Sequence, residues 1–462
     1  MMDLINNFFT QFSNYIWNVV SILVIGGGII FFTYLIESDI FSRLNPIQYF
    51  KHAFNVLSGK YDTPDEKGQI SHFQALSTAL SSTVGIGNIA GVAIAISMGG
   101  PGALFWMWVS AIVGMATKFF TCSLGIMFRG YDSANELQGG PMYVIEQGMG
   151  KKFKFLSYWF SGAGLIGCLS LLQVNQLTQI ISNDIISNDN NVPYIKLIIG
   201  IIVAIIVSFV IFGGLKRIAD VASKLVPFMV FIYLLCGISI IMINIDSIPS
   251  VFSLIFNGAF NESSIYGGVA GIMVIGFQRA AFSNEAGMGT EVMAIGASRT
   301  NEPIRSGFVA MLGPFIDTIL VCSVTGIVIL LSNDWSVSTL DGSTLKGAVL
   351  TQTAFSNHLG MVGHYILLFS VITFALSTMF GYSYYGCKCA SYLFGTGSKV
   401  YYRIFYVLTL VAGAVLPLEL AVAIVDSMFA LMAIPTMISA LYLSGHVEKE
   451  FRRYFSQLEE KK

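Results

Sequence analysis

Long hydrophobic runs separated by short polar segments follow one another along most of the chain. A helix that spans a bilayer needs roughly 20 consecutive apolar residues. About eleven runs reach or approach this length, although the tenth is short and the seventh is interrupted. They cover residues 15–37, 72–98, 102–128, 155–181, 194–213, 225–245, 265–283, 307–331, 363–386, 402–417 and 420–444. The pattern predicts an all-α polytopic membrane protein with about 11 transmembrane helices.

The composition agrees with this prediction. Of the 462 residues, 55% are hydrophobic and 11% are charged, whereas an ordinary soluble chain has roughly 25% charged residues. Neither the six cysteines nor the five histidines show the spacing of a metal site or a catalytic triad. We therefore expect neither an enzyme nor a resident cofactor. The net charge of -1 says little about partners. We expect no nucleic-acid partner, and no obligatory protein partner is evident.

The distribution of lysine and arginine predicts the orientation of the chain. These residues gather after the first, third, fifth, seventh and ninth predicted spans and in the C-terminal tail. The alternate loops, 182–193, 246–264 and 332–362, contain Lys346 alone. Since cytoplasmic loops carry the excess of positive charge, we expect the N-terminus outside and the C-terminus in the cytoplasm of a cell (plasma or inner) membrane. An odd number of spans agrees with ends on opposite sides.

The second predicted span is interrupted by small and polar residues. Residues 78–91 read Thr-Ala-Leu-Ser-Ser-Thr-Val-Gly-Ile-Gly-Asn-Ile-Ala-Gly. A broken helix at membrane depth is tolerated where it lines a protected or water-filled site, which in transporters often holds substrate and ions. The alternative is that small residues only allow close helix packing, with Gly87 and Gly91 in a G-x-x-x-G spacing. This segment alone does not decide between the two interpretations.

The seventh predicted span has a similar interruption. Between Gly267 and Thr290, glycine, asparagine and hydroxyl residues again break an apolar helix. The two interrupted spans lie five apart and run in opposite directions, which is typical of transporters built from inverted repeats. This arrangement predicts a first five-helix repeat over 71–245 and a second, inverted repeat over 246–444.

The two ends of the chain lie outside these repeats. Residues 1–70 are expected to form a peripheral transmembrane helix and a cytoplasmic interfacial helix, and 445–462 a cytoplasmic tail. The apolar residues of 45–58 recur at helical spacing, which suits a helix lying on the membrane surface. An ordinary connecting helix is an equal alternative.

Several ionisable residues fall inside predicted spans. Arg279 and Glu285 flank the second interruption and are interpreted either as a cytoplasmic gate pair or as a helix end. Asp317 and Asp426 could carry protons or hydrogen-bond to neighbouring helices. Lys118 is expected to extend its ammonium group to the membrane interface.

Four stretches of the chain resemble the alanine or glycine:cation symporter family, the sodium:alanine symporters. They are 82–93 (Ser-Thr-Val-Gly-Ile-Gly-Asn-Ile-Ala-Gly-Val-Ala), 99–108 (Gly-Gly-Pro-Gly-Ala-Leu-Phe-Trp-Met-Trp), 138–143 (Gln-Gly-Gly-Pro-Met-Tyr) and 282–289 (Phe-Ser-Asn-Glu-Ala-Gly-Met-Gly). The resemblance covers the whole transporter core. It implies a leucine-transporter-type 5+5 inverted repeat preceded by one peripheral helix, and symport of alanine or glycine with sodium into the cell by alternating access.

The resemblance also implies the site residues. Substrate-binding positions are Thr83, Ile86, Gly87, Asn88, Gln173, Phe282 and Tyr382. Sodium would be bound by hydroxyls of Ser377 and Thr378 and by carbonyls of Ser81, Val84 and Phe374. An amino-acid zwitterion with sodium needs both an unwound helix start for its carboxylate and free oxygens for the ion.

Two departures from the family pattern fall in the expected pocket. Tyr382 stands where members often have tryptophan, and Val174-Asn175-Gln176 stands where they often have Asn-Ser after the glutamine. The substrate within the class of small neutral amino acids therefore stays open. Two alternatives also stay open. One is a proton-coupled transporter of the same fold that uses Asp317 or Asp426. The other is a channel, although the chain lacks a repeated filter motif.

Overall fold

The fold consists almost entirely of helices. The structure is a computed structural model that describes residues 2–37, 46–62, 66–185, 192–260, 268–336 and 347–460. The strands β1 (Gly130–Tyr131) and β2 (Leu137–Gln138) pair antiparallel. The helical elements are α1 (Met2–Glu37), α3 (Pro46–Leu57), α4 (His72–Thr83), η1 (Gly87–Gly91), α5 (Val92–Gly99), α6 (Gly102–Met127), α7 (Pro141–Val144), η2 (Ile145–Met149), η3 (Lys151–Phe153), α8 (Lys154–Gly167), α9 (Leu171–Ile185), α10 (Val192–Ile211), α11 (Gly214–Ile243), η5 (Ile245–Ser247), α12 (Ile248–Ala259), α13 (Gly268–Asn284), α14 (Thr290–Ile295), α15 (Pro303–Pro314), η6 (Phe315–Cys322), α16 (Ser323–Ser332), η7 (Asp334–Ser336), α17 (Ala348–Phe394), α18 (Ser398–Val415) and α19 (Leu418–Glu460).

The helices confirm a polytopic membrane protein. Within the described residues, eight helices are long and apolar enough to cross a membrane, or nine when the bent pair of α4 with η1 and α5 is included. The remaining predicted spans, 265–283 and 402–417, coincide with α13 and α18, which are helical but fall short in length or apolarity. The total of eleven spans stays a prediction.

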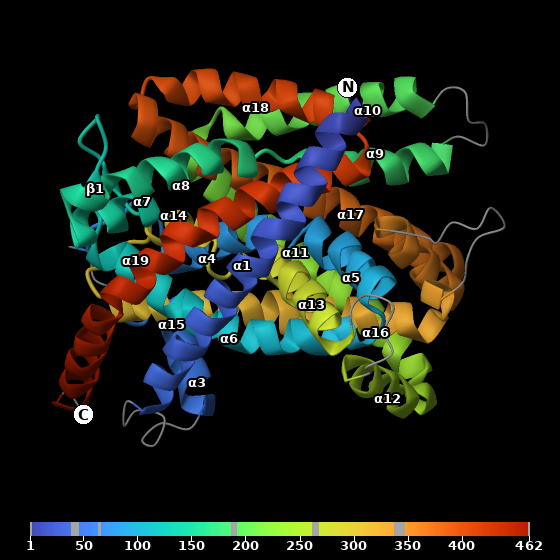
Figure 1. The fold of residues 1–462 in the computed structure, drawn as a ribbon, viewed down its shortest axis with the longest axis horizontal. Helices are drawn as coiled ribbons and strands as arrows, with labels where there is room; N and C mark the ends of the chain where they lie inside the picture. Colours follow the sequence, from blue (N-terminus) through green and yellow to red (C-terminus); the bar gives the residue numbers. More distant parts are fainter. Residues whose placement is uncertain are drawn as a thin grey trace.

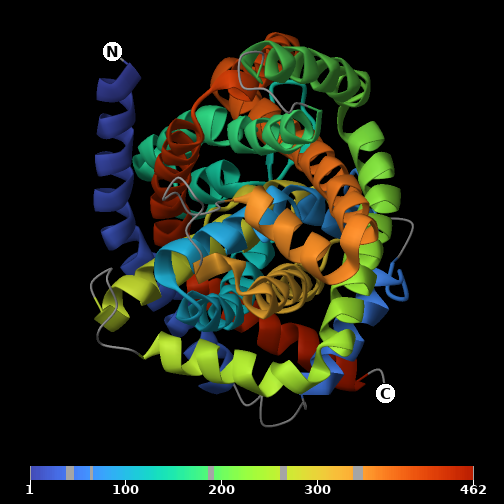
Figure 2. The ribbon, with the colours of Figure 1, turned by 90° about the vertical axis from the view of Figure 1, so that its right-hand side faces the viewer.

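The first predicted break is present at the end of α4. The helix starts with a capping box, in which Ser71 and Gln74 each satisfy the other's backbone N–H. It ends at Thr83, and the next residue, Val84, has an extended ψ of 90°. The chain then continues through the π-helix η1 into α5 at a bend of 48°. Figures 1 and 2 show α4 and α5, in blue, near the centre of the molecule.

The second predicted break separates α13 from α14. Glu285, Gly287 and Gly289 have φ angles of 55°, 84° and 86°. Glycine adopts this left-handed conformation without strain, whereas a residue with a β-carbon rarely does. The positive angles stop α13 at Asn284 and allow α14 to begin at Thr290.

The N-terminal helix lies at the periphery of the molecule. α1 packs against α19 and α6, and Figure 2 shows it along one outer edge. The indole N–H of Trp17 donates to the carbonyl of Asp426 at 3.1 Å, which ties α1 to α19. The two termini lie on opposite sides of the fold (Figure 1).

The segment expected to form an interfacial helix is helical as α3, and part of its surface packs on protein. Its place at the membrane surface stays a prediction. Ala53 and Val56 are buried. The ring of Phe50 lies 4.9 Å from that of Phe315, and His52 Nε2 lies 2.9 Å from the hydroxyl of Tyr454. α3 therefore joins the N-terminal segment to η6 and to the end of α19, while Phe54 stays exposed.

The expectation for Lys118 was wrong. Its side chain is only 2% exposed and does not reach the surface. α6 is covered by α1, α13 and α15, so a lysine in its middle has no free path along the helix to the interface.

Candidate functional site

The break after α4 leaves two backbone carbonyls without their usual helical donors. In an α-helix the N–H of residue i donates to the carbonyl of residue i−4. Gly85 N–H instead donates to the side-chain oxygen of Asn88 at 2.8 Å, and Asn88 N–H donates to the carbonyl of Gly85 at 3.1 Å. The carbonyls of Ser81 and Val84 thus lose these two donors. They are the carbonyls that the resemblance assigns to sodium.

α17 brings hydroxyl groups to the same break. Ser377 and Thr378 each donate to the carbonyl of Phe374 at 2.9 Å. A β-carbon at Gly85 would overlap with Thr378 Oγ1 and would lie 3.6 Å from the Phe374 carbonyl oxygen. The structure therefore brings the five residues expected to bind sodium to one place. Carbonyls and hydroxyls of this kind suit a hard cation.

The residues expected to bind the substrate carboxylate begin the second half of the broken span. Ile86, Gly87 and Asn88 lie at the start of η1, and all three are buried. The first N–H groups of a helical segment lack partners within it and carry partial positive charge. A β-carbon at Gly87 would lie 3.3 Å from the ring of Phe282, so glycine allows this close approach. The hydroxyl of Thr83 donates back to the carbonyl of Ala79 at 3.3 Å.

Gln173, in α9, has an unused acceptor. Its side chain is 2% exposed, and Oε1 has no hydrogen-bond partner among the described residues. A buried amide oxygen without a donor is destabilising by about 1–3 kcal/mol. The ammonium group of an amino acid would supply such a donor.

Three aromatic side chains pack together near the second break. The rings of Phe282 and Tyr382 lie 5.7 Å and 6.0 Å from the ring of Phe429, and all three residues are buried. The sequence indicated Phe282 and Tyr382 but missed Phe429. Phe429 lies in the middle of an apolar stretch of α19, so no local pattern distinguishes it from an ordinary core residue.

Arg279 and Glu285, interpreted from the sequence either as a cytoplasmic gate pair or as a helix end, have different partners. Arg279 forms an ion pair with Asp426 in α19, and both side chains are buried. Glu285 accepts hydrogen bonds from Tyr382 Oη at 2.5 Å and from the hydroxyl of Thr290. No ion pair or hydrogen bond of the described residues joins Arg279 to Glu285. Two separate interactions thus stand on either side of Phe282 along the chain.

Asp317 connects the first break to the π-helix η6. Its carboxylate accepts hydrogen bonds from Asn88 Nδ2 at 2.5 Å, Ser283 Oγ at 2.7 Å and Thr318 Oγ1 at 2.8 Å. Asp317 is fully buried, and among the described residues no ion pair involves it. A buried carboxylate is stabilised by such donors or by a nearby cation, and otherwise takes up a proton.

Comparison with known proteins supplies the context for this geometry. A model of the sodium:alanine symporter family matches residues 2–462. The sodium/alanine symporter AgcS of Methanococcus maripaludis is 38% identical over 449 residues, which cover 96% of this chain and 95% of that protein. The putative sodium/proton-dependent alanine carrier protein YrbD of Bacillus subtilis is 36% identical over 363 residues, covering 76% and 73% of the two chains.

A solved structure shows the same fold. The crystal structure of MhsT in complex with L-phenylalanine superimposes with a TM-score of 0.60 at 15% sequence identity. The match covers 80% of this chain and 89% of that one. At this identity the similarity concerns the fold alone, and it confirms the leucine-transporter-type architecture predicted from the sequence.

Proposed function

Because this chain belongs to the sodium:alanine symporter family, we propose that it carries alanine or glycine into the cell together with sodium. Family membership makes it a membrane transporter that couples an amino acid to a cation, and not an enzyme. The choice of sodium and of these two amino acids is the proposal. The observation that supports the proposal most is that the carbonyls without helical donors at the first break lie next to the hydroxyls of α17.

Sodium would bind between the end of α4 and the middle of α17. The carbonyls of Ser81, Val84 and Phe374 and the hydroxyls of Ser377 and Thr378 offer five neutral oxygens. Such a site holds a monovalent cation without a charged ligand of its own. Bound sodium would join the broken span to α17, so ion binding would favour one arrangement of these two elements.

The amino acid would bind beside the ion at the two breaks. Its carboxylate would accept hydrogen bonds from the backbone N–H groups of Ile86 and Gly87, where the helix dipole favours a negative charge. Gln173 Oε1 would accept from its ammonium group. Phe282, Tyr382 and Phe429 would enclose the side chain and exclude large ones by steric overlap.

Coupling to sodium supplies the energy for accumulation. One sodium ion that crosses a potential of about 100 mV releases about 2.3 kcal/mol. This corresponds to roughly fiftyfold accumulation, because about 1.4 kcal/mol is a factor of ten. In the proposed cycle sodium binds first from outside, the amino acid follows, the core rocks against its scaffold, and both solutes leave to the cytoplasm. The N-terminus would then lie outside and the C-terminus in the cytoplasm.

The two buried polar pairs would act in separate gates. With this orientation Arg279 and Asp426 lie on the outer side of Phe282, and Glu285 and Tyr382 lie on its inner side. The ion pair of Arg279 with Asp426 supports an outer gate between α13 and α19. The hydrogen bond of Tyr382 to Glu285 supports an inner one between α17 and the second break.

The function is tested by uptake of labelled alanine into vesicles that contain the purified protein. We expect uptake under an inward sodium gradient and competition by glycine. Uptake that ignores sodium and follows an inward proton gradient would contradict sodium coupling. That outcome would favour the second candidate, a proton-coupled transporter, for which the buried Asp317 without an ion-pair partner is the supporting observation.

A further inference from the structure

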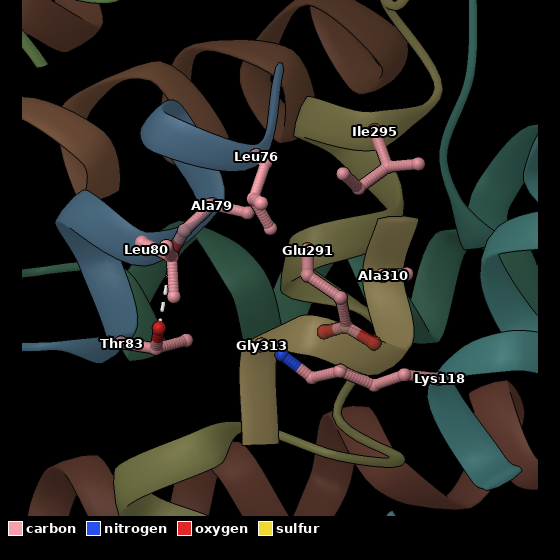
Figure 3. A pocket seen from close by; sticks show the side chains of 9 residues that line it. All are labelled: Leu76, Ala79, Leu80, Thr83, Lys118, Glu291, Ile295, Ala310 and Gly313. Atoms are coloured by element: carbon pink, nitrogen blue, oxygen red, sulfur yellow. Dashed lines mark hydrogen bonds between the residues drawn. The ribbon is translucent and has the colours of Figure 1, made fainter. Parts of the chain in front are cut away.

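A small, partly open cavity lies between α4 and α14, one half of each of the two broken spans. Its walls come from α4, α6, α14 and α15, and the empty space between these walls, including the open side, amounts to about 210 Å³. One stripe of α4 lines it at helical spacing, with Leu76, Ala79, Leu80 and Thr83. Opposite this stripe lie Lys118, Glu291, Ile295, Ala310 and Gly313, as Figure 3 shows.

Two charged side chains in this cavity lack strong partners. Lys118 is 2% exposed, and no hydrogen bond or ion pair of the described residues involves its ammonium group. Glu291 is 1% exposed, and among the described residues the hydroxyls nearest its carboxylate, those of Thr290 at 3.4 Å and Thr121 at 3.5 Å, make shorter hydrogen bonds to Glu285 and to the carbonyl of Thr117. Hydroxyl donors normally lie about 2.7–2.8 Å from their acceptors.

Two buried charges without close partners lower the stability of the folded protein. An ion taken out of water without a close partner loses several kcal/mol of solvation, by order of magnitude. The two side chains line one cavity without forming an ion pair with each other. Gly313 preserves space at this point, because a β-carbon there would lie 3.2 Å from Lys118 Nζ.

We propose that Lys118 and Glu291 form a second amino-acid subsite, which the substrate occupies on its way to the cytoplasm. A neutral amino acid is a zwitterion, so its carboxylate would pair with Lys118 and its ammonium with Glu291. The small residues Ala79, Ala310 and Gly313 line the cavity, so a small substrate side chain would fit between them once α4 and α14 move apart. This subsite rests on the proposed function and adds a release step to it.

The position of the cavity supports this route. Thr83 lines the cavity and is also the last residue of α4, next to the proposed primary site. α4 and α14 are the halves of the two broken spans on the cytoplasmic side in the proposed orientation. In this structure the cavity is nowhere wide enough for a water molecule, so the subsite fills only when these halves separate.

The test compares the two faces of the membrane. Alanine transport is measured in right-side-out and inside-out membrane vesicles, with sodium and alanine added on the same side. For Lys118→Gln and Glu291→Gln we expect the KM at the cytoplasmic face to rise at least about tenfold. The KM at the outer face should stay within about threefold of the unmodified protein, because the primary site is intact.

A second variant and a control separate this role from a structural one. Ala79→Leu narrows the cavity without changing charge and should raise the cytoplasmic KM alone, even if the charge variants fail to fold. Lys196→Gln is the matched control, because α10 contributes no residue to the cavity wall. Equal KM changes at both faces, or no change, would overturn the subsite. Absence of sodium-dependent alanine transport in the unmodified protein would instead overturn the proposed function.

Discussion

Gly85 lies so close to Thr378 that a β-carbon at position 85 would overlap with the threonine hydroxyl. This approach joins the first broken span to α17 at the proposed sodium site. Glycine is needed here for the space beside its α-carbon, since its φ is not in the left-handed region. Position 85 is therefore the position of the proposed ion site that should be most sensitive to an added side chain.

Gly85→Ala should therefore disrupt sodium coupling. The added methyl group has to displace either Thr378 or the break, and both carry proposed sodium ligands. We expect sodium-dependent alanine uptake to fall at least about tenfold, equivalent to about 1.4 kcal/mol. Gly162→Ala is the control, because nothing lies within 4 Å of a β-carbon at that position. Normal uptake by Gly85→Ala would show that this contact does not shape the ion site.

Phe282→Ala should widen substrate selection. Removal of the ring opens the aromatic wall that it shares with Tyr382 and Phe429. Larger neutral amino acids such as valine should then compete with labelled alanine. The variant will also be less stable by about 3–5 kcal/mol, so competition is compared at equal amounts of folded protein. The control is Phe405→Ala, at a 51% exposed position of α18, which should leave substrate selection unchanged. If the amino acids that compete with alanine are also unchanged in Phe282→Ala, the pocket lies elsewhere.

Tyr382→Phe should lower the stability of the folded protein, because Glu285 loses a hydrogen-bond donor. The change removes the hydroxyl that donates to this buried carboxylate at 2.5 Å. Loss of one donor to a buried charged group costs about 1–3 kcal/mol, so thermal unfolding should occur at a lower temperature. Tyr382→Trp, the residue common in the family, retains a donor and should lose less. Equal losses in the two variants would mean that the hydrogen bond contributes little.

The two breaks were predictable from sequence because their cause is local. Glycines 85, 87, 287 and 289 interrupt apolar runs that are otherwise long enough to span, and the structure breaks the helices at these places. The length of the hydrophobic runs likewise located most of the membrane helices.

The partners of buried polar groups were not predictable in this way. Arg279 pairs with Asp426, 147 residues away, and Tyr382 reaches Glu285 across 97 residues. Lys118 is buried because three other helices cover α6. The sequence around Lys118 does not reveal this packing, and so its side chain was expected at the membrane interface. Contacts of this kind depend on how distant segments pack together, and the local pattern of residues does not predict that packing.

His52 should make stability depend on pH. Burial in the contact between α3 and α19, with a smaller contribution from the charge of Arg305, lowers the pKa of His52 from 6.5 to about 4. The folded protein therefore holds this side chain neutral, while the unfolded chain takes up a proton below pH 6.5. The stabilisation is complete above pH 6.5 and is lost as the pH falls toward 4.

A variant that cannot titrate tests this dependence. The unfolding temperature of the unmodified protein should fall more steeply between pH 7 and about pH 5 than that of His52→Gln. Parallel curves for the two proteins would show that His52 is not held neutral by the fold.

The most direct test of the central claim is the sodium concentration that gives half-maximal alanine uptake in Thr378→Ala. Thr378 donates its hydroxyl within the proposed ion site, whereas Thr373, five residues earlier in α17, bonds to the carbonyls of Phe369 and Ser370. We expect the half-maximal sodium concentration to rise at least about tenfold in Thr378→Ala and to stay unchanged in Thr373→Ala. An unchanged sodium dependence in Thr378→Ala would contradict the assignment of the coupling ion to this break.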